Sequence, residues 1–396
     1  MTIQTDTEQQ RADDFMGYGD NLAPAERETL ASLRRLMRQV DDGELASAWE
    51  RAEFPFRLIA PLAEHGLLGQ HIQDEDERSH LLRGLMTAEL ARKDASLATF
   101  TGVSGGLFGI SIRRFGSSDQ KQEILPLIAS GEIVGGFGLT EPASGSDIAG
   151  GITTTATPCP DGWILTGEKR WIGNATWCDR VVVWAKQAGS TDRFLGFVVP
   201  TDSPGFTAVK IEGKYSLRSV QNAHITLDGV RVPDTARLPA VHSFRQVSEV
   251  LKLTRLEVGW AALGNSLGAF DAALAHARSH EQFGRPIARF QLVQDLLVRA
   301  EGNIASSLGL LSQASRLADE DRLGEEQASL AKLVAASRAR DTVSLCREIL
   351  GGDGILLTNK AVKHFMDAEA FYTFEGTHQI NSLIVGRALT GVSAFT

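Results

Sequence analysis

Three stretches of the chain differ in how their hydrophobic residues are spaced. From residue 23 to 132 the sequence is rich in Ala, Leu, Glu and Arg, with apolar positions at helical spacing, which predicts an N-terminal α domain. Residues 1–22 are polar, and we expect them to form a flexible N-terminus. Proline and glycine are expected to break the helices of the first domain at Pro55, Pro61, Gly84, Gly105–Gly106 and Gly116–Ser117.

Between residues 133 and 243 the pattern changes to short β-branched or aromatic runs separated by turn residues, which predicts a middle β domain. Buried strands are expected at Trp163–Thr166, Val181–Trp184 and Phe194–Val199. The run from His224 to Val232 is interrupted by Asp228–Gly229, a common turn pair, so we expect a hairpin there.

Helical periodicity returns after residue 243 and predicts a C-terminal helical domain over residues 244–396. Long amphipathic helices of this kind usually pack into a bundle. The order of helices, strands and helices predicts an α+β fold with segregated elements. The clearest apolar stripe consists of Val293, Leu297, Ala300, Ile304, Leu308 and Leu311.

Composition narrows the class of protein. The 396 residues are 43% hydrophobic and 22% charged, as in ordinary globular proteins. A net charge of −9 argues against a nucleic-acid partner. We find no signal-peptide pattern and no apolar run of about eighteen residues, so we expect a cytoplasmic protein without membrane insertion. Cys159, Cys178 and Cys346 form no CxxC pair, so neither a disulfide framework nor a metal site is expected.

Two segments are rich in groups that could carry chemistry. Residues 137–147 leave a predicted strand and enter a loop of glycines and hydroxyls, which could hydrogen-bond a flavin ring and a pantetheine chain. On local physics alone, an ordinary strand exit with Asx or serine turns is the commoner explanation of this loop. Residues 372–377 place Glu375 beside aromatic rings, whose apolar surroundings would raise the pKa of a general base. The alternative is an acid that favours the N-terminus of the following helix.

Three weaker segments have structural explanations as well as functional ones. Gly351–Gly354 could let a phosphate lie against the backbone, or it could simply end a helix. The Trp171 ring could stack on a flat cofactor, although a core tryptophan is commoner. Residues 282–287 mark a turn between two long helices. The Rossmann glycine fingerprint is missing from the sequence, so a nicotinamide cofactor is not supported.

The order and spacing of these segments over residues 25–396 resemble the acyl-CoA dehydrogenase family, and within it the branch of glutaryl-CoA dehydrogenases and plant short-chain acyl-CoA oxidases. The resemblance implies an acyl-CoA dehydrogenase-like α+β fold with an N-terminal helical domain, a middle β-barrel-like domain and a C-terminal four-helix bundle. It also implies FAD, a homotetramer and a role in fatty acid metabolism. The matching motifs are Leu139–Pro142 with Gly145–Asp147, Trp171–Ile172 with Asn174, Gln282–Gly284 with Pro286, Gly351–Gly352 with Gly354, and Phe374–Thr377.

By motif match, the resemblance assigns site residues in three groups. Glu375 would be the catalytic base. The cofactor would contact Leu139, Thr140, Ser146, Trp171, Gly173, His280, Phe283, Gln291, Gly351, Gly352 and Thr377. The substrate would contact Ser146, Arg255, Ala98, Phe100 and Gly376. No metal is implied.

The activity that the resemblance implies is FAD-dependent α,β-dehydrogenation of an acyl-CoA to the trans-2-enoyl-CoA. Glu375 would take the α proton, and the β hydrogen would pass as hydride to flavin N5. An electron-transfer flavoprotein would be the electron acceptor.

Three positions depart from the pattern of the relatives. Ala98 stands where glutaryl-specific enzymes have an arginine, which disfavours glutaryl-CoA, the decarboxylating alternative. Gly173 stands where many dehydrogenases have a threonine that contacts flavin N5, as in the plant oxidases, so oxygen is an alternative acceptor. His280 stands where relatives often have an arginine that reaches a neighbouring subunit's FAD.

Overall fold

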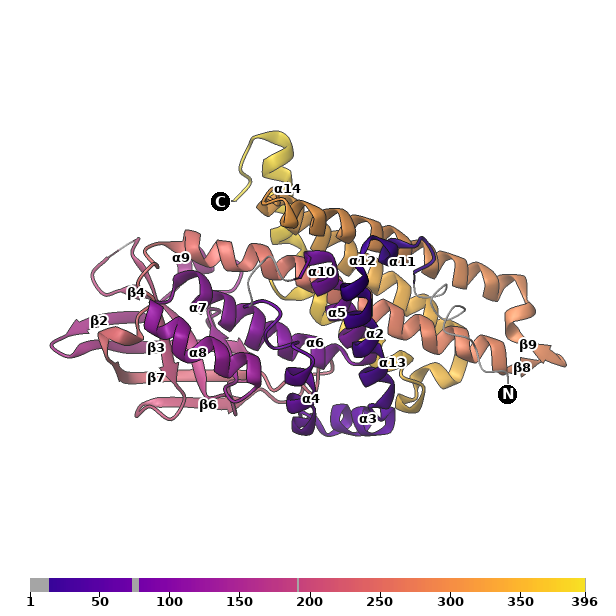
Figure 1. The fold of residues 1–396 in the computed structure, drawn as a ribbon, viewed down its shortest axis with the longest axis horizontal. Coiled ribbons are helices and arrows are strands. Elements are labelled where there is room, and N and C mark those ends of the chain that lie inside the picture. Colours follow the sequence, from indigo (N-terminus) through magenta and orange to yellow (C-terminus); the bar gives the residue numbers. More distant parts are fainter. Residues whose placement is uncertain (1–13, 73–77, 191, 396) are drawn as a thin grey trace.

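The computed structural model describes residues 14–72, 78–190 and 192–395 (Figure 1). Most of the predicted flexible N-terminus lies outside these ranges. Its described part includes a 3-10 turn, η1 (Tyr18–Asn21), and Leu22 is 3% exposed. This end of the segment therefore packs against the rest of the protein. For residues 1–13, flexibility stays a prediction.

The N-terminal stretch is helical, as predicted. Gly84 lies within a helix and does not end it. A Cβ at this position would lie 2.2 Å from the Trp260 ring, so the glycine allows two helices to approach closely. The elements are α2 (Pro24–Gln39), α3 (Asp42–Arg51), η2 (Phe56–Leu58), α4 (Ile59–Glu64), α5 (His80–Lys93), α6 (Ala95–Thr101), the π-helical η4 (Gly102–Gly109), α7 (Ile110–Phe115) and α8 (Ser118–Ser130).

Gly105 and Gly106 also continue a helix rather than ending one. They belong to the π-helical turn η4, and a Cβ on Gly105 would lie 2.4 Å from the Leu68 carbonyl oxygen. The helical run Ala95–Phe115 is long and apolar enough to span a membrane by composition, yet 78% of its most apolar window is buried inside the protein. That burial is the pattern of a core helix.

The middle stretch forms a curled seven-stranded sheet beside the helices (Figure 1). The strand order is β1-β4-β2-β3-β7-β6, and β5 pairs with β4. All three predicted strands are present, within β3, β4 and β5. The elements are β1 (Gly135–Gly138), α9 (Ile148–Gly151), β2 (Thr155–Cys159), β3 (Gly162–Ile172), β4 (Arg180–Gln187), β5 (Phe194–Pro200), β6 (Phe206–Lys210), β7 (Ala223–Val232) and η5 (Asp234–Ala236).

The hairpin predicted at Asp228–Gly229 was wrong. Residues 223–232 are one strand, β7, and Asp228–Gly229 form a bulge in its pairing with β3, where the register shifts between Leu165 and Gly167. Gly229 has φ +64°, the conformation that such a bulge favours in glycine. A turn pair within a long strand can therefore bend the strand without reversing it.

The C-terminal stretch is a helical bundle whose longest helix, α10, packs on both α5 and α12. The predicted stripe lies on α11, where its last four members are buried. Together these elements confirm the α+β architecture expected from the sequence. The elements are α10 (Phe244–Ser279), β8 (Glu281–Gln282), β9 (Arg285–Pro286), η6 (Ile287–Arg289), α11 (Gln291–Asp319), α12 (Glu325–Ile349), η7 (Gly351–Ile355), η8 (Leu357–Asn359), α13 (Ala361–Thr373) and α14 (His378–Thr390).

A buried carboxylate joins all three stretches. One oxygen of Asp367, on α13, accepts hydrogen bonds from the Trp49 indole of α3 at 3.0 Å and from the Leu217 amide of the middle stretch at 2.6 Å. Burial raises the pKa of Asp367 to about 6, against the lowering effect of nearby Lys363. The Asp367 carboxyl therefore loses hydration on burial, and in its place it holds the helices and the middle stretch together through hydrogen bonds.

Candidate active site

Glu375 occupies a strained turn between two helices. The chain leaves α13 at Thr373, and Glu375 and Gly376 have φ of +55° and +85° before Thr377 caps α14 by accepting from the Ile380 amide at 3.2 Å. A left-handed conformation is uncommon for a residue with a Cβ and costs on the order of 1 kcal/mol or more. Contacts from other helices must therefore hold Glu375 in place.

Two consecutive residues of α10 provide part of that support. The Thr254 hydroxyl donates to Glu375 Oε2 at 2.9 Å, and Arg255 Nε donates to the Glu375 carbonyl at 3.4 Å. The residue is only partly buried, but its carboxyl is enclosed by protein, and this burial raises the pKa of Glu375. The Thr254 hydrogen bond and the charges of Arg255 and Lys332 oppose the rise without cancelling it. The carboxylate is thus more basic than in water and has fixed partners.

Lys332 supplies the contact that sequence reasoning missed. This fully buried α12 residue donates from Nζ to the Gly376 carbonyl at 2.8 Å and to the Tyr372 carbonyl at 3.3 Å, on the two sides of Glu375. Asn381 also donates to the Gly376 carbonyl at 2.8 Å. Burial lowers the pKa of Lys332 to about 7, although the charge of Glu375 favours the ammonium. A lone lysine among the alanines of α12 was the available sequence signal.

Arg255, predicted to contact substrate, has protein partners in the structure. The residue is 5% exposed, and its guanidinium forms a 2.9 Å ion pair with Glu325 in addition to its contact with the Glu375 carbonyl. Its position next to the catalytic candidate agrees with the expectation, whereas direct substrate contact stays a prediction.

The loop that follows β1 is anchored by a second buried pair. Lys169 Nζ lies 2.8 Å from Glu141 and donates to the Leu139 carbonyl at 3.1 Å, while Glu141 also accepts from the amides of Thr153 and Thr154 at 2.6 and 2.9 Å. Burial acts against both charges, lowering the pKa of Lys169 to about 8. For Glu141, Lys169 and these hydrogen bonds outweigh burial and hold the pKa at about 2. The pair fixes the loop to β3.

This anchoring leaves polar groups of the loop without protein partners. Within the ranges that the structure describes, the hydroxyls of Thr140 and Ser146 make no hydrogen bond to protein. Leu139 is buried, and Trp171 is half exposed with φ +67°. The structure thus combines two available hydroxyls and an accessible indole, as expected for a site that holds a flat polar ring.

Gly173 lies against the π-helical turn of the N-terminal stretch. A Cβ at this position would lie 3.2 Å from Val103 Cγ2 and 3.8 Å from Val220 Cγ1. A methyl group would therefore be crowded by Val103, on η4, unless the valine moved. The glycine and the valine form a matched pair that could not be recognised from either position in the sequence.

The two residues predicted on α6 lie in the packed core. Ala98 is 3% exposed and Phe100 is fully buried. The Phe100 ring lies 4.7 Å from that of Phe54 and 5.9 Å from that of Trp177, centre to centre. Phe100 therefore belongs to an aromatic cluster between helices and sheet. Its role as a wall of the acyl pocket stays a prediction, as does that of Ala98.

The remaining predicted cofactor contacts lie at the other end of the bundle. His280 ends α10, and Phe283, in the turn between β8 and β9, is 92% exposed with φ +54°. Gln291, Gly351 and Gly352 are exposed, and a Cβ on either glycine would meet no other atom within 4 Å. Thr254 and His276 are 22 residues apart on α10, roughly 33 Å along the helix. One chain therefore separates these residues widely from Glu375.

Comparison with known proteins identifies relatives over the whole fold. Family models described as the N-terminal, middle and C-terminal domains of acyl-CoA dehydrogenase match residues 23–132, 136–230 and 244–390. The chain is 31% identical over 373 residues to the short-chain specific acyl-CoA dehydrogenase of Bos taurus mitochondria, covering 90% of this chain and 89% of the relative.

Two solved structures are also similar. The glutaryl-CoA dehydrogenase of Mycobacterium smegmatis is 40% identical with a TM-score of 0.92. Another glutaryl-CoA dehydrogenase from that organism, in complex with FADH2, is 34% identical with a TM-score of 0.93. Each alignment covers 97% of this chain and 99% of the other.

The contacts of Lys332 lead to a first prediction. In Lys332→Met the Glu375 turn loses two hydrogen bonds and a positive charge, so reduction of bound flavin by an acyl-CoA should slow by up to about 100-fold. Because the lost charge had stabilised the carboxylate, the pKa of Glu375 should rise, and the acid limb of the rate–pH profile should move to higher pH.

Stopped-flow reduction over a pH series measures both effects. Lys332→Gln keeps a hydrogen-bond donor without the charge and should reproduce the pH shift with a smaller loss of rate. An unchanged pH profile in both variants, with flavin content and thermal unfolding intact, would show that Lys332 does not act on Glu375.

Proposed function

Because the chain belongs to the acyl-CoA dehydrogenase family and is an FAD-dependent oxidoreductase acting on acyl-CoA, we propose that it converts a saturated acyl-CoA to the trans-2-enoyl-CoA with Glu375 as the base. The observation that carries this proposal is the Glu375 carboxyl itself. It is enclosed, it has a raised pKa, and α10 and α12 hold its turn.

The residues of this chain fit FAD. The hydroxyls of Thr140 and Ser146, which have no hydrogen-bond partner among the described residues, and the half-exposed Trp171 ring suit a polar ring system. The open space beside Gly351 and Gly352 suits close approach by a dinucleotide. When bound, the flavin supplies the acceptor for the β hydrogen as hydride.

Glu375 performs the proton chemistry. The α carbon of a thioester is weakly acidic, so a base with a raised pKa takes its proton more readily than an ordinary carboxylate in water. The Thr254 hydroxyl fixes one carboxylate oxygen, which orients the other toward the α proton. A positioned general base of this kind contributes about 10²- to 10⁴-fold to the rate.

The same turn offers a donor to the developing negative charge. As the α proton leaves, charge moves onto the thioester carbonyl oxygen and requires nearby hydrogen-bond donors. The Glu375 backbone N–H has no backbone acceptor within the described part of the chain. The left-handed turn thus makes it available to the substrate, so that one residue provides both the base and a donor.

An uncharged acyl chain suits the surroundings of α6 best. Ala98 offers no cation to a distal carboxylate, and Arg255, the predicted substrate contact, is paired with Glu325. An unpaired carboxylate in an apolar cleft costs several kcal/mol, whereas each buried methylene gains roughly 0.8 kcal/mol. The 40% identity to a glutaryl-CoA dehydrogenase favours glutaryl-CoA as the second candidate.

Anaerobic titration of the yellow holoprotein with an acyl-CoA panel tests the activity and the substrate class. We expect butyryl- and hexanoyl-CoA to bleach the flavin and to exceed glutaryl-CoA in kcat/KM by at least about 100-fold, the equivalent of a few kcal/mol. Glutaryl-CoA turning over best, with release of carbon dioxide, would overturn the substrate class. No bleaching by any member would overturn the proposed reaction.

For the electron acceptor we propose an electron-transfer flavoprotein, with oxygen as the alternative. Glycine at position 173 lacks the hydroxyl that many relatives carry. A Cβ at position 173 would lie 3.2 Å from Val103 Cγ2, so the space beside Gly173 is partly filled from the π-helical turn. This filling supports restricted oxygen access, whereas the missing hydroxyl supports an oxidase.

The matched pair can be tested with two variants. Gly173→Thr alone would clash with Val103, so it is made in a Val103→Ala background and compared with Val103→Ala alone. We expect the double variant to reoxidise more slowly in oxygen, because threonine restores both bulk and a hydroxyl. Equal stopped-flow reoxidation rates would show that position 173 does not govern the acceptor.

We also propose that the protein is a homotetramer in which two chains share each flavin. The predicted cofactor contacts are divided between the two ends of α10, roughly 33 Å apart, which favours a site completed by a second copy. Large apolar side chains are exposed near the distal set: Phe283, Leu292, Val298, Ile355 and Leu356. A flavin-loaded chain that sediments as a monomer would contradict this assembly.

A further inference from the structure

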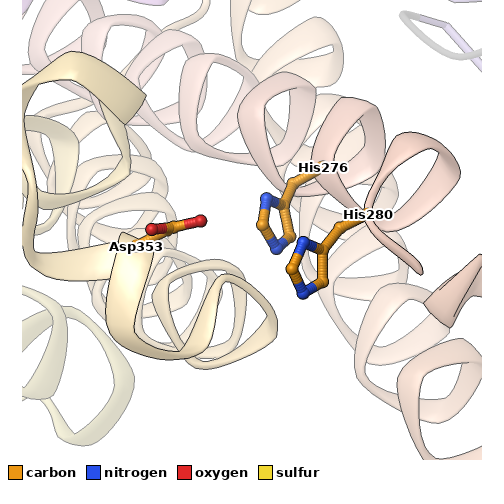
Figure 2. Close-up of side chains that lie close together, drawn as sticks. All are labelled: His276, His280 and Asp353. Carbon is orange, nitrogen blue, oxygen red and sulfur yellow. The ribbon is translucent and has the colours of Figure 1, made fainter. Parts of the chain in front are cut away.

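Two histidines and an aspartate come together at the C-terminal end of α10 (Figure 2). His276 and His280 lie one turn apart on the same face of the helix end, and Asp353 faces them from η7. One ring nitrogen of each histidine and one carboxylate oxygen all lie within 4.8 Å of one another. No metal site was expected from the spacing of the cysteines, and Asp353 is too far from the two histidines in the sequence to form a recognisable ligand motif with them.

The backbone holds the three side chains in this arrangement. The His280 amide closes the helix by donating to the His276 carbonyl at 2.8 Å. The Asp353 amide donates to the Leu350 carbonyl at 3.1 Å, and Asn359 donates to the Asp353 carbonyl at 3.0 Å. The ligand atoms are therefore brought together by the fold and not by bonds among themselves.

The side chains are available for binding. In the described ranges neither the His276 ring nor the Asp353 carboxylate has a hydrogen-bond partner, and His280 uses one ring nitrogen toward Gln282 at 3.2 Å. Metal-bound histidines usually donate the N–H of their second ring nitrogen to an acceptor, a role that Gln282 fills when its side-chain amide is turned so that the oxygen faces His280. His276 and Ser279 also line a cleft of about 1050 Å³ between α2, α5 and α10.

The charges favour a cation over an anion. The imidazole rings are nearly parallel, with 16° between their planes and 4.6 Å between their centres, and two protonated rings this close would repel each other. A phosphate would also face the Asp353 carboxylate. The C-terminal end of a 36-residue helix adds partial negative charge.

We propose that His276, His280 and Asp353 bind one divalent transition-metal ion. Two imidazoles and one carboxylate suit Zn²⁺, Co²⁺ or Ni²⁺, whereas Mg²⁺ and Ca²⁺ prefer ligand sets made only of oxygen. Bonds of about 2.0–2.2 Å require the ligand atoms to approach further, which rotations of partly exposed side chains allow. The ion joins α10 to η7 beside Gly351 and Gly352, so in this proposal His280 is a metal ligand and not the cofactor contact predicted from the sequence. Binding of the ion does not depend on the proposed reaction.

The experiment uses full-length, flavin-loaded protein without a histidine tag, after treatment with a chelator. Co²⁺ is titrated by calorimetry, and its visible absorption reports ligation by nitrogen. We expect one Co²⁺ per chain, displaced by Zn²⁺. His276→Ala and Asp353→Ala should each weaken binding by at least about 10- to 100-fold. The matched control His242→Ala, which removes an exposed histidine elsewhere, should bind as the wild type does.

Two results would overturn the proposal. One is the absence of stoichiometric Co²⁺ binding to the wild-type holoprotein, with phosphate binding in its place. The other is equal binding by the wild type, His276→Ala and Asp353→Ala. Circular dichroism of each variant establishes that a loss of binding is not a loss of fold, and Asp353→Asn gives a second, milder test at the η7 side.

Discussion

The geometry of the candidate site depends on the left-handed turn at Glu375 and Gly376. This turn is unfavourable by itself, and Lys332 from α12 stabilises it by donating to carbonyls on both sides, while Thr254 and Arg255 from α10 bind the Glu375 side chain and carbonyl. Because α10 and α12 belong to the bundle core, the packing of the bundle determines the position of the Glu375 carboxyl. A change in helix packing would therefore move the carboxylate.

Buried charges serve the same purpose elsewhere in the molecule. Glu141 and Lys169 fix the loop that leaves the Thr140 and Ser146 hydroxyls available, and Asp367 joins α3 and α13 to the middle stretch. Each pair or group gives up hydration, which a hydrophobic contact would not require. Each of these buried charged groups holds backbone groups at defined distances through hydrogen bonds, which are more directional than apolar contacts. The polar interior is thus concentrated where parts of the site meet.

The sequence was sufficient for the order of helices and strands and for the position of Glu375 just before the last helix, because both rest on local patterns. Contacts between distant residues could not be predicted. Gly84 marks a close approach to Trp260 and not a helix end, and Asp228–Gly229 form a bulge because β3 continues alongside. In the sequence Lys332 resembles an ordinary helix lysine, and its contacts with the turn are seen only in the packing of α12. The sequence predicts the helix that carries Phe100 but not the direction of its side chain, which in the structure faces the aromatic cluster.

The central claim is that the enclosed Glu375 carboxyl takes the α proton. The most direct measurement is the anaerobic, stopped-flow rate of flavin reduction by a saturated acyl-CoA in Glu375→Gln, beside the wild type. The amide keeps the size of the side chain and can accept from Thr254, but it cannot take a proton. We expect intact flavin and acyl-CoA binding with a rate of flavin reduction about 10²- to 10⁴-fold lower. A wild-type rate in the folded, flavin-loaded variant would contradict this claim.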